Sequence, residues 1–239
     1  MKQYTKLYRD ILKMRNLSLV IGCGYTSQRN YCKTSQVVAL DIDRRKLIHA
    51  RSQDSKAYFI LCDANFLPFK PKSFFDVVCT DILEHVTTYE NVVKEIVRLG
   101  SSILYLRFPT AEREKLLVKA SKVYRKYHWG KIHVRLIDPN KMSAMLKSRY
   151  IIHLIPTPAF STFQRLFLHK MLEIFGFQYA IPDVGLIIIP DQKFIHKFII
   201  YLSFIFGQLF GYPSYCIWKF LRIKTIHDNY IVHAYLRSF

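Results

Sequence analysis

The sequence lacks the features of a small secreted or disordered protein. Its five cysteines form no C-x-x-C pair, so we expect reduced, mostly buried thiols in a cytoplasmic protein. The N-terminal residues are charged and polar, without the apolar core of a secretory signal. Neither internal repeats nor low-complexity linkers occur. With 51% hydrophobic residues, the 239-residue chain can bury a substantial core.

Acidic residues are scarce. Asp and Glu total 17 against 36 Lys and Arg, which gives a formal net charge of +19. This charge attracts anions, so nucleic acid, an anionic membrane surface and a phosphorylated substrate are all compatible partners. Residues 198–218 carry no charge, but glycine, proline and polar residues interrupt the second half of this segment. We therefore expect a buried hairpin or an interfacial helix there, and peripheral association with anionic membranes, rather than a membrane span.

Apolar runs alternate with amphipathic stretches along the first half of the chain. This pattern predicts an α/β fold, a Rossmann-like doubly wound and mostly parallel sheet, with a hydrophobic helical C-terminal extension. We expect a core of residues 1–155, and an aromatic-rich region, residues 156–239, that completes the sheet and forms a substrate cap or a membrane-facing part. The predicted strands are 17–21, 37–40, 57–61, 75–79, 102–108, 150–155 and 184–189. The predicted helices are 43–51, 90–99, 112–127, 138–147 and an aromatic helix at 160–175.

The first predicted strand runs into a Gly-x-Gly turn at Gly22 and Gly24. Glycine permits a sharp turn and a close approach to a ligand. The second strand ends at Asp41, where a carboxylate can accept both ribose hydroxyls of an adenosine cofactor. Asp41 could instead cap the following helix, a role that Asp43 could also fill. An NAD-dependent oxidoreductase has the same glycine turn and acid, so these two features alone do not identify the class of enzyme.

Further motifs follow downstream in a fixed order. They are Asp-Ala at 63–64, Leu-Pro-Phe at 67–69, Ser-Phe-Phe-Asp-Val-Val at 73–78, Leu-Glu-His-Val at 83–86, Glu-Ile-Val-Arg-Leu at 95–99 and Phe-Pro at 108–109. Together with the glycine turn, residues 17–110 resemble the small-molecule, type 11-like class I methyltransferases that depend on S-adenosylmethionine. A nicotinamide enzyme has no need of Leu-Pro-Phe there. The sequence departs from the family in having Val20 where an acid is usual, in lacking a third glycine, and in having a shortened turn before the fifth strand.

The resemblance implies a site for S-adenosyl-L-methionine. Gly22 and Gly24 would hold the methionine part, Asp41 the ribose, and Asp63 with the Ala64 backbone the adenine. Thr80 lies in the segment that would close over the sulfonium. If a hydroxyl is methylated, His85 and His133 are candidate general bases, although each could be a purely structural histidine. No spacing of ligand residues predicts a metal site.

We therefore predict an S-adenosylmethionine-dependent methyltransferase. The aromatic residues after Phe160 favour a small apolar or lipid-linked acceptor, methylated at oxygen or carbon. An RNA methyltransferase is an alternative, supported by the net charge and by Lys115, Lys119, Lys122 and Lys126 on one predicted helix, but without an Asn-Pro-Pro-Tyr motif. A non-catalytic binding protein with a methyltransferase fold is another alternative, because Val20 replaces the usual acid.

Overall fold

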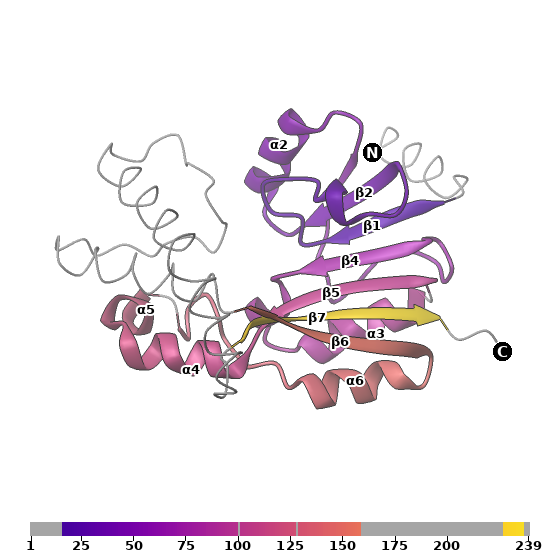
Figure 1. Cartoon of the computed structure of the whole chain (residues 1–239). Helices are drawn as coiled ribbons and strands as arrows, with labels where there is room; N and C mark the ends of the chain where they lie inside the picture. The colour runs from indigo at the N-terminus through magenta and orange to yellow at the C-terminus, as the bar shows by residue number, and fades with distance from the viewer. Residues whose placement is uncertain (1–15, 100, 128, 159–226, 237–239) are drawn as a thin grey trace. The chain divides into compact units, whose positions relative to one another are not determined.

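The computed structural model describes residues 16–99, 101–127, 129–158 and 227–236 (Figure 1). These residues fall into two units. The first holds those of Met1–Phe108, Asp138–Ile155 and Ile231–Phe239, and the second those of Pro109–Ile137 and Pro156–Tyr230. The first unit contains the glycine turn and most of the sheet.

Seven strands of the described chain form one sheet in the order β3-β2-β1-β4-β5-β7-β6. Neighbouring strands from β3 to β5 pair in parallel, and β7 points opposite to β4 (Figure 1). The predicted doubly wound, mostly parallel sheet is therefore confirmed. The bounds are β1 Leu17–Ile21, β2 Gln36–Asp41, β3 Tyr58–Leu61, β4 Asp76–Thr80, β5 Ile103–Pro109, β6 Tyr150–Pro158 and β7 His227–Leu236.

The central strands form the core. Every residue of β1 and β4, and all of β2 except Gln36, is buried, as expected for parallel strands that are covered on both faces. On one face Val20, Val37 and Val78 pack together with Leu47 of α2 (Arg44–Gln53). Helix α3 (Tyr89–Leu99) buries Val92, Val93, Ile96 and Leu99. This burial explains why these strands are continuous apolar runs in the sequence.

The helices follow their capping signals. Asp43 accepts a hydrogen bond from the Arg45 amide at the start of α2, and Asp138 accepts one from the Asn140 amide at the start of α6 (Pro139–Lys147). The prediction of one helix over residues 112–127 is wrong, because two helices occur there, α4 (Ala111–Ala120) and α5 (Lys122–Tyr127). Ser121 leaves the helical conformation between them, with φ −124° and ψ 121°, and its hydroxyl accepts from the Tyr124 amide at 3.0 Å. The predicted lysine stripe is accordingly divided between two helices.

The connection between β1 and β2 is unusually simple. A parallel crossover generally contains an α-helix. Here residues 22–35 contain one 3-10 turn, η1 (Arg29–Tyr31), whose N-cap residue Gln28 has a left-handed backbone with φ +50°. The segment that follows the glycine turn must therefore be held by side-chain contacts.

Several predicted elements lie outside the described residues. They are the aromatic helix at 160–175, the strand at 184–189 and the uncharged segment at 198–218. The hydrophobic C-terminal extension therefore stays a prediction. Within the described chain, the helices are too short or too polar to cross a membrane.

Candidate functional site

The predicted cofactor residues gather at one edge of the sheet. The register pairs Ile21 with Leu40 and Cys79, and Asp41 with Leu61, so the carboxyl ends of β1 to β4 are level. Gly22, Gly24, Asp41, Asp63, Ala64 and Thr80 lie at or just beyond these strand ends. The connections diverge between β1 and β4, which is the switch point where doubly wound sheets bind ligands.

The two glycines of the turn are needed for different reasons. Both have a left-handed backbone, with φ +67° at Gly22 and +62° at Gly24. A Cβ at Gly22 would lie 2.0 Å from the Ile82 side chain, whereas a Cβ at Gly24 would meet no atom within 4 Å. Gly22 therefore lets the segment after β4 pack against the turn, while Gly24 borders open space that a ligand can occupy.

Asp41 braces the glycine turn. Its Oδ2 accepts a hydrogen bond from the Gly24 amide at 2.8 Å, and its Oδ1 accepts one from the Asp43 amide at 2.9 Å. The cap of α2 is Asp43, so the alternative role of Asp41 as that cap is filled by its neighbour. A carboxylate offers about four acceptor positions, so two remain for ribose hydroxyls. Asp41 is 5% exposed, which suits a group at the floor of a site.

The loop after β3 combines a carboxylate with exposed apolar side chains. Asp63 Oδ1 accepts from the Asn65 amide at 2.8 Å and from its side chain at 2.9 Å. The other oxygen, Oδ2, accepts no hydrogen bond from the described residues. Ile42 at the end of β2 is 71% exposed and Phe66 is 76% exposed. An open acceptor beside exposed apolar surface suits a planar base with an amino group.

Other motif residues hold this loop in place. The Arg98 guanidinium donates to the carbonyl oxygens of Phe69 at 2.8 Å and Leu67 at 2.9 Å. Glu95 pairs with Arg98 and accepts from the Leu67 amide at 3.0 Å. The Arg98 hydrogen bonds keep the pKa of Glu95 below its usual range. The motifs at 67–69 and 95–99 therefore fasten the loop between β3 and β4 to α3.

Gln28 links the glycine turn to β4. Its side-chain amide donates to the carbonyl oxygens of Gly22 at 3.3 Å and Cys23 at 3.4 Å, and accepts from the Thr80 hydroxyl at 2.8 Å. Thr80 is buried, and its hydroxyl is engaged by this amide. Gln28 is not among the residues that the sequence predicts, because no motif marks a glutamine in this loop.

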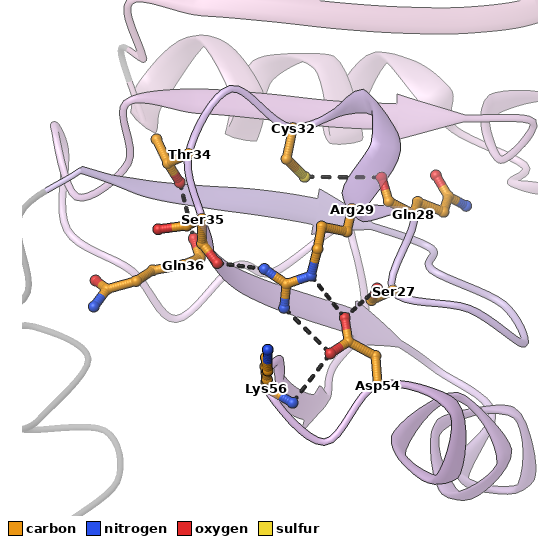
Figure 2. Close-up of polar contacts among 9 residues, drawn as sticks. All are labelled: Ser27, Gln28, Arg29, Cys32, Thr34, Ser35, Gln36, Asp54 and Lys56. Carbon is orange, nitrogen blue, oxygen red and sulfur yellow. Dashed lines mark hydrogen bonds and ion pairs between the residues drawn. The ribbon is translucent and has the colours of Figure 1, made fainter.

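Arg29 and Asp54 form a clamp that ties the connection between β1 and β2 to the end of α2 (Figure 2). Arg29 Nε lies 2.9 Å from Asp54 Oδ2, and Arg29 Nη2 lies 3.3 Å from Oδ1. Ser27 donates to the same carboxylate at 2.6 Å, and the third Arg29 nitrogen, Nη1, donates to the Ser35 carbonyl. The Arg29 hydrogen bonds, helped by Ser27, lower the pKa of Asp54 to about 2. The clamp holds a segment that has no crossover helix.

A second ion pair lies beyond β4. Asp81, with φ +53°, accepts from two nitrogens of Arg107, which is the register partner of Thr80 on β5. Arg107 also donates to the Tyr31 hydroxyl at 3.3 Å and lies over that ring, 5.7 Å from its centroid. Burial opposes the charge of Arg107, but Asp81 holds its pKa above the usual range. The sequence signal for Arg107 is a lone charge within the apolar run of β5.

The two candidate bases lie in different units. His85 ends η2 (Leu83–His85), directly after the segment that follows β4, and is half-buried. His133 belongs to the second unit and is buried, with Nδ1 3.0 Å from Glu114 Oε2 and 3.1 Å from the Tyr124 hydroxyl. Burial opposes ionisation of Glu114, but His133 keeps its pKa below the usual range. This cluster gives His133 a structural role in the second unit, and general-base roles for both histidines stay predictions.

Val20 occupies the place of the acid that is usual in the family. It is fully buried in an apolar cluster with Cys23, Val37, Ala39 and Val78, and Tyr105 packs against the cluster. Burial raises the pKa of the Cys23 thiol to about 12. The position is therefore part of the core and supplies no contact to a charged ligand.

Comparison with known proteins identifies the kind of domain to which this sheet edge belongs. Residues 19–102 match the family model of a methyltransferase domain. The matched segment, residues 19–102, is therefore a methyltransferase domain. The cofactor of this domain is S-adenosylmethionine. No curated protein matches the chain.

Solved structures share the fold of this methyltransferase domain. A protein from Galdieria sulphuraria assigned as a sarcosine dimethylglycine methyltransferase is 10% identical, with a TM-score of 0.54, and the match covers 97% of this chain and 83% of that one. A protein from Bacillus halodurans assigned as a methyltransferase is 15% identical, with a TM-score of 0.53 and full coverage of both chains. Haemonchus contortus phosphoethanolamine N-methyltransferase 2, solved with S-adenosyl-L-methionine, is 16% identical, with a TM-score of 0.54. This chain is fully covered by the last match but spans 53% of that protein, and these likenesses concern the fold alone.

Proposed function

We propose that the protein transfers the methyl group of S-adenosylmethionine to a small apolar or lipid-linked acceptor, at oxygen or carbon. The observation that carries the proposal is the row of Gly24, Asp41 and Asp63 along one sheet edge within a methyltransferase domain. Gly24 borders open space, and Asp41 and Asp63 keep acceptor positions for the ribose and the adenine amino group. The exposed Ile42 and Phe66 would contact the faces of the base.

The bound cofactor supplies an activated methyl group on a sulfonium, so the protein needs no nucleophile of its own. Its residues have to fix the cofactor and keep water from the reacting atoms. Asp41 would fix the cofactor at the ribose, because it joins the glycine turn to the end of β2. The loop that Arg98 holds would fix the cofactor on the adenine side. His85 follows the segment after β4 and is our candidate for accepting a proton from an acceptor hydroxyl.

Calorimetry with S-adenosylmethionine and S-adenosylhomocysteine tests the cofactor, and transfer of a labelled methyl group to a cell extract tests the acceptor. We expect micromolar cofactor binding, and label in the organic phase after solvent partition. Label in the RNA fraction would favour the RNA methyltransferase alternative. An Asp41→Ala protein is the control for label that appears without a bound cofactor.

A non-catalytic role is a second candidate, favoured by two observations. Val20 is enclosed in apolar core, and the β1–β2 connection has no crossover helix. A binding protein would take up the cofactor and transfer no methyl group. Cofactor binding without label in any fraction of the extract would support this role.

We also propose that residues 198–218 attach the protein to anionic membranes from the cytoplasmic side. Lys193, Lys197, Lys219, Arg222 and Lys224 flank this uncharged stretch, and each basic residue near an anionic surface adds about 1 kcal/mol. Release of the protein from a membrane fraction by high salt would support peripheral attachment. Retention until detergent is added would indicate a span.

A further inference from the structure

We propose that Asp81 and Arg107 bind the amino-acid end of the cofactor, Asp81 its ammonium group and Arg107 its carboxylate. This assignment rests on the proposed function, because it supposes that S-adenosylmethionine occupies the sheet edge. It concerns the half of the site for which the usual acid is replaced by Val20.

The position of the pair supports the assignment. Asp81 directly follows β4, whose Cys79 is the register partner of Ile21, the last residue of β1 before the glycine turn. The neighbouring Ile82 touches Gly22 so closely that a Cβ there would collide with it. The Asp81 amide donates to the Arg107 carbonyl at 2.9 Å, which fixes the aspartate beside β5. The pair therefore lies next to the turn, at the switch point of the sheet.

The charges of the pair complement those of the ligand. An α-amino acid carries one ammonium and one carboxylate group, and the pair offers one carboxylate and one guanidinium. The guanidinium fork holds the Asp81 carboxylate with two hydrogen bonds here, and it can hold the ligand carboxylate in the same way once the ligand ammonium pairs with Asp81. The side chains of Arg107 and Asp81 are 26% and 34% exposed, so a ligand can reach both. Without ligand, each charge neutralises the other.

The surroundings hold the pair in place. Tyr31 accepts a hydrogen bond from Arg107 and packs against Tyr105, with ring centroids 5.1 Å apart. The left-handed backbone of Asp81 is costly for a residue other than glycine, and such strain concentrates at ligand sites. The Asp41 carboxylate is assigned to the ribose and braces the glycine turn through two backbone amides. Asp81 is therefore the carboxylate that is left for the ammonium group.

Calorimetry with three ligands tests the assignment on the full chain. S-adenosylhomocysteine carries both charges, its decarboxylated form, S-adenosyl-3-thiopropylamine, keeps the ammonium group alone, and 5′-methylthioadenosine has neither. The variants are Arg107→Met, which keeps the length of the side chain, and Asp81→Asn, because asparagine tolerates a left-handed backbone. Arg149→Met is the matched control. Arg149 directly precedes β6, is half-buried, and donates a hydrogen bond to the Val97 carbonyl.

We expect Arg107→Met to lower the affinity for S-adenosylhomocysteine about tenfold or more. The affinities for the other two ligands should change by less than about twofold. Asp81→Asn should weaken both ammonium-bearing ligands and leave 5′-methylthioadenosine unchanged. Unchanged affinity of both variants for S-adenosylhomocysteine would overturn the assignment, and so would an equal loss for all three ligands. If the parent protein binds none of the three, the proposed function itself fails, and the assignment with it.

Discussion

The adenosine half and the methionine half of the sheet edge differ in how closely they follow the methyltransferase pattern. On the adenosine side, Asp41 and Asp63 stand at the ends of β2 and β3, as the motifs predict. On the methionine side, Val20 is core, one 3-10 turn replaces a crossover helix, and Gln28 and the Asp81–Arg107 pair surround the glycine turn. Under the proposed assignment, the adenosine contacts follow the family pattern while the contacts around the amino-acid end differ from it.

The largest expected effect concerns the adenosine side. Asp41→Ala removes the ribose acceptor and two charge-assisted hydrogen bonds, so we expect at least a thirtyfold loss of cofactor affinity, or about 2 kcal/mol. The melting temperature should also fall, by roughly 4–8 °C. Asp43→Ala is the control two residues away, because it removes the cap of α2 and an exposed ion pair with Arg45 but leaves Asp41 in place. Calorimetry showing equal affinities for Asp41→Ala and the parent would contradict the ribose contact.

The two glycines sharpen the comparison within the turn. Gly24→Ala places a methyl group in open space, so we expect about a tenfold loss of affinity with a stability loss of about 1 kcal/mol from the left-handed backbone. Gly22→Ala collides with Ile82, so we expect a greater loss of stability. Thermal melts compared with cofactor titrations separate the two. Equal melting temperatures for the two variants would show that the contact at Gly22 is relieved without cost.

The clamp on the methionine side should have a smaller effect. Arg29→Met and Asp54→Asn each free the connection between β1 and β2, and we expect affinity to fall about threefold. A double-mutant cycle on cofactor binding should give a coupling free energy of about 0.5–1 kcal/mol between Arg29 and Asp54. This value is small because both side chains are partly exposed. Additive effects on cofactor binding would mean that the pair does not act as a clamp.

The smallest expected effect is a pH dependence. The pKa of Asp54 is lowered to about 2 in the folded protein, against an ordinary value near 4. The stabilisation from this lowered pKa is present above pH 4 and is lost as the pH falls toward 2. Carbon-13 NMR of the aspartate carboxyls, with Asp54→Asn to assign the signal, measures the midpoint. A midpoint near 4 would show that Arg29 does not hold the carboxylate in solution.

The sequence predicts the sheet well because buried parallel strands are continuous apolar runs, and β1 is matched to the residue. It fails at Ser121, because the lysine and apolar spacing continues across the break while a single hydroxyl caps the next helix. Asp41 and Asp63 are predictable because each stands alone at a strand end. Gln28, Arg29 and Arg107 are harder to predict, since their roles depend on partners 25 to 52 residues away in the sequence.

The apolar cluster around Val20 also limits how this sequence can evolve. A single mutation to aspartate would bury a carboxylate among Cys23, Val37 and Val78, where an ionised group costs several kcal/mol. Descendants that acquire an acid at this position would lose stability before they gain a ligand contact. The neighbours that would first have to change lie in the glycine turn, β2 and β4, so a single substitution does not accommodate the acid. In lineages that carry this cluster, the exposed residues along the sheet edge should vary while position 20 stays apolar.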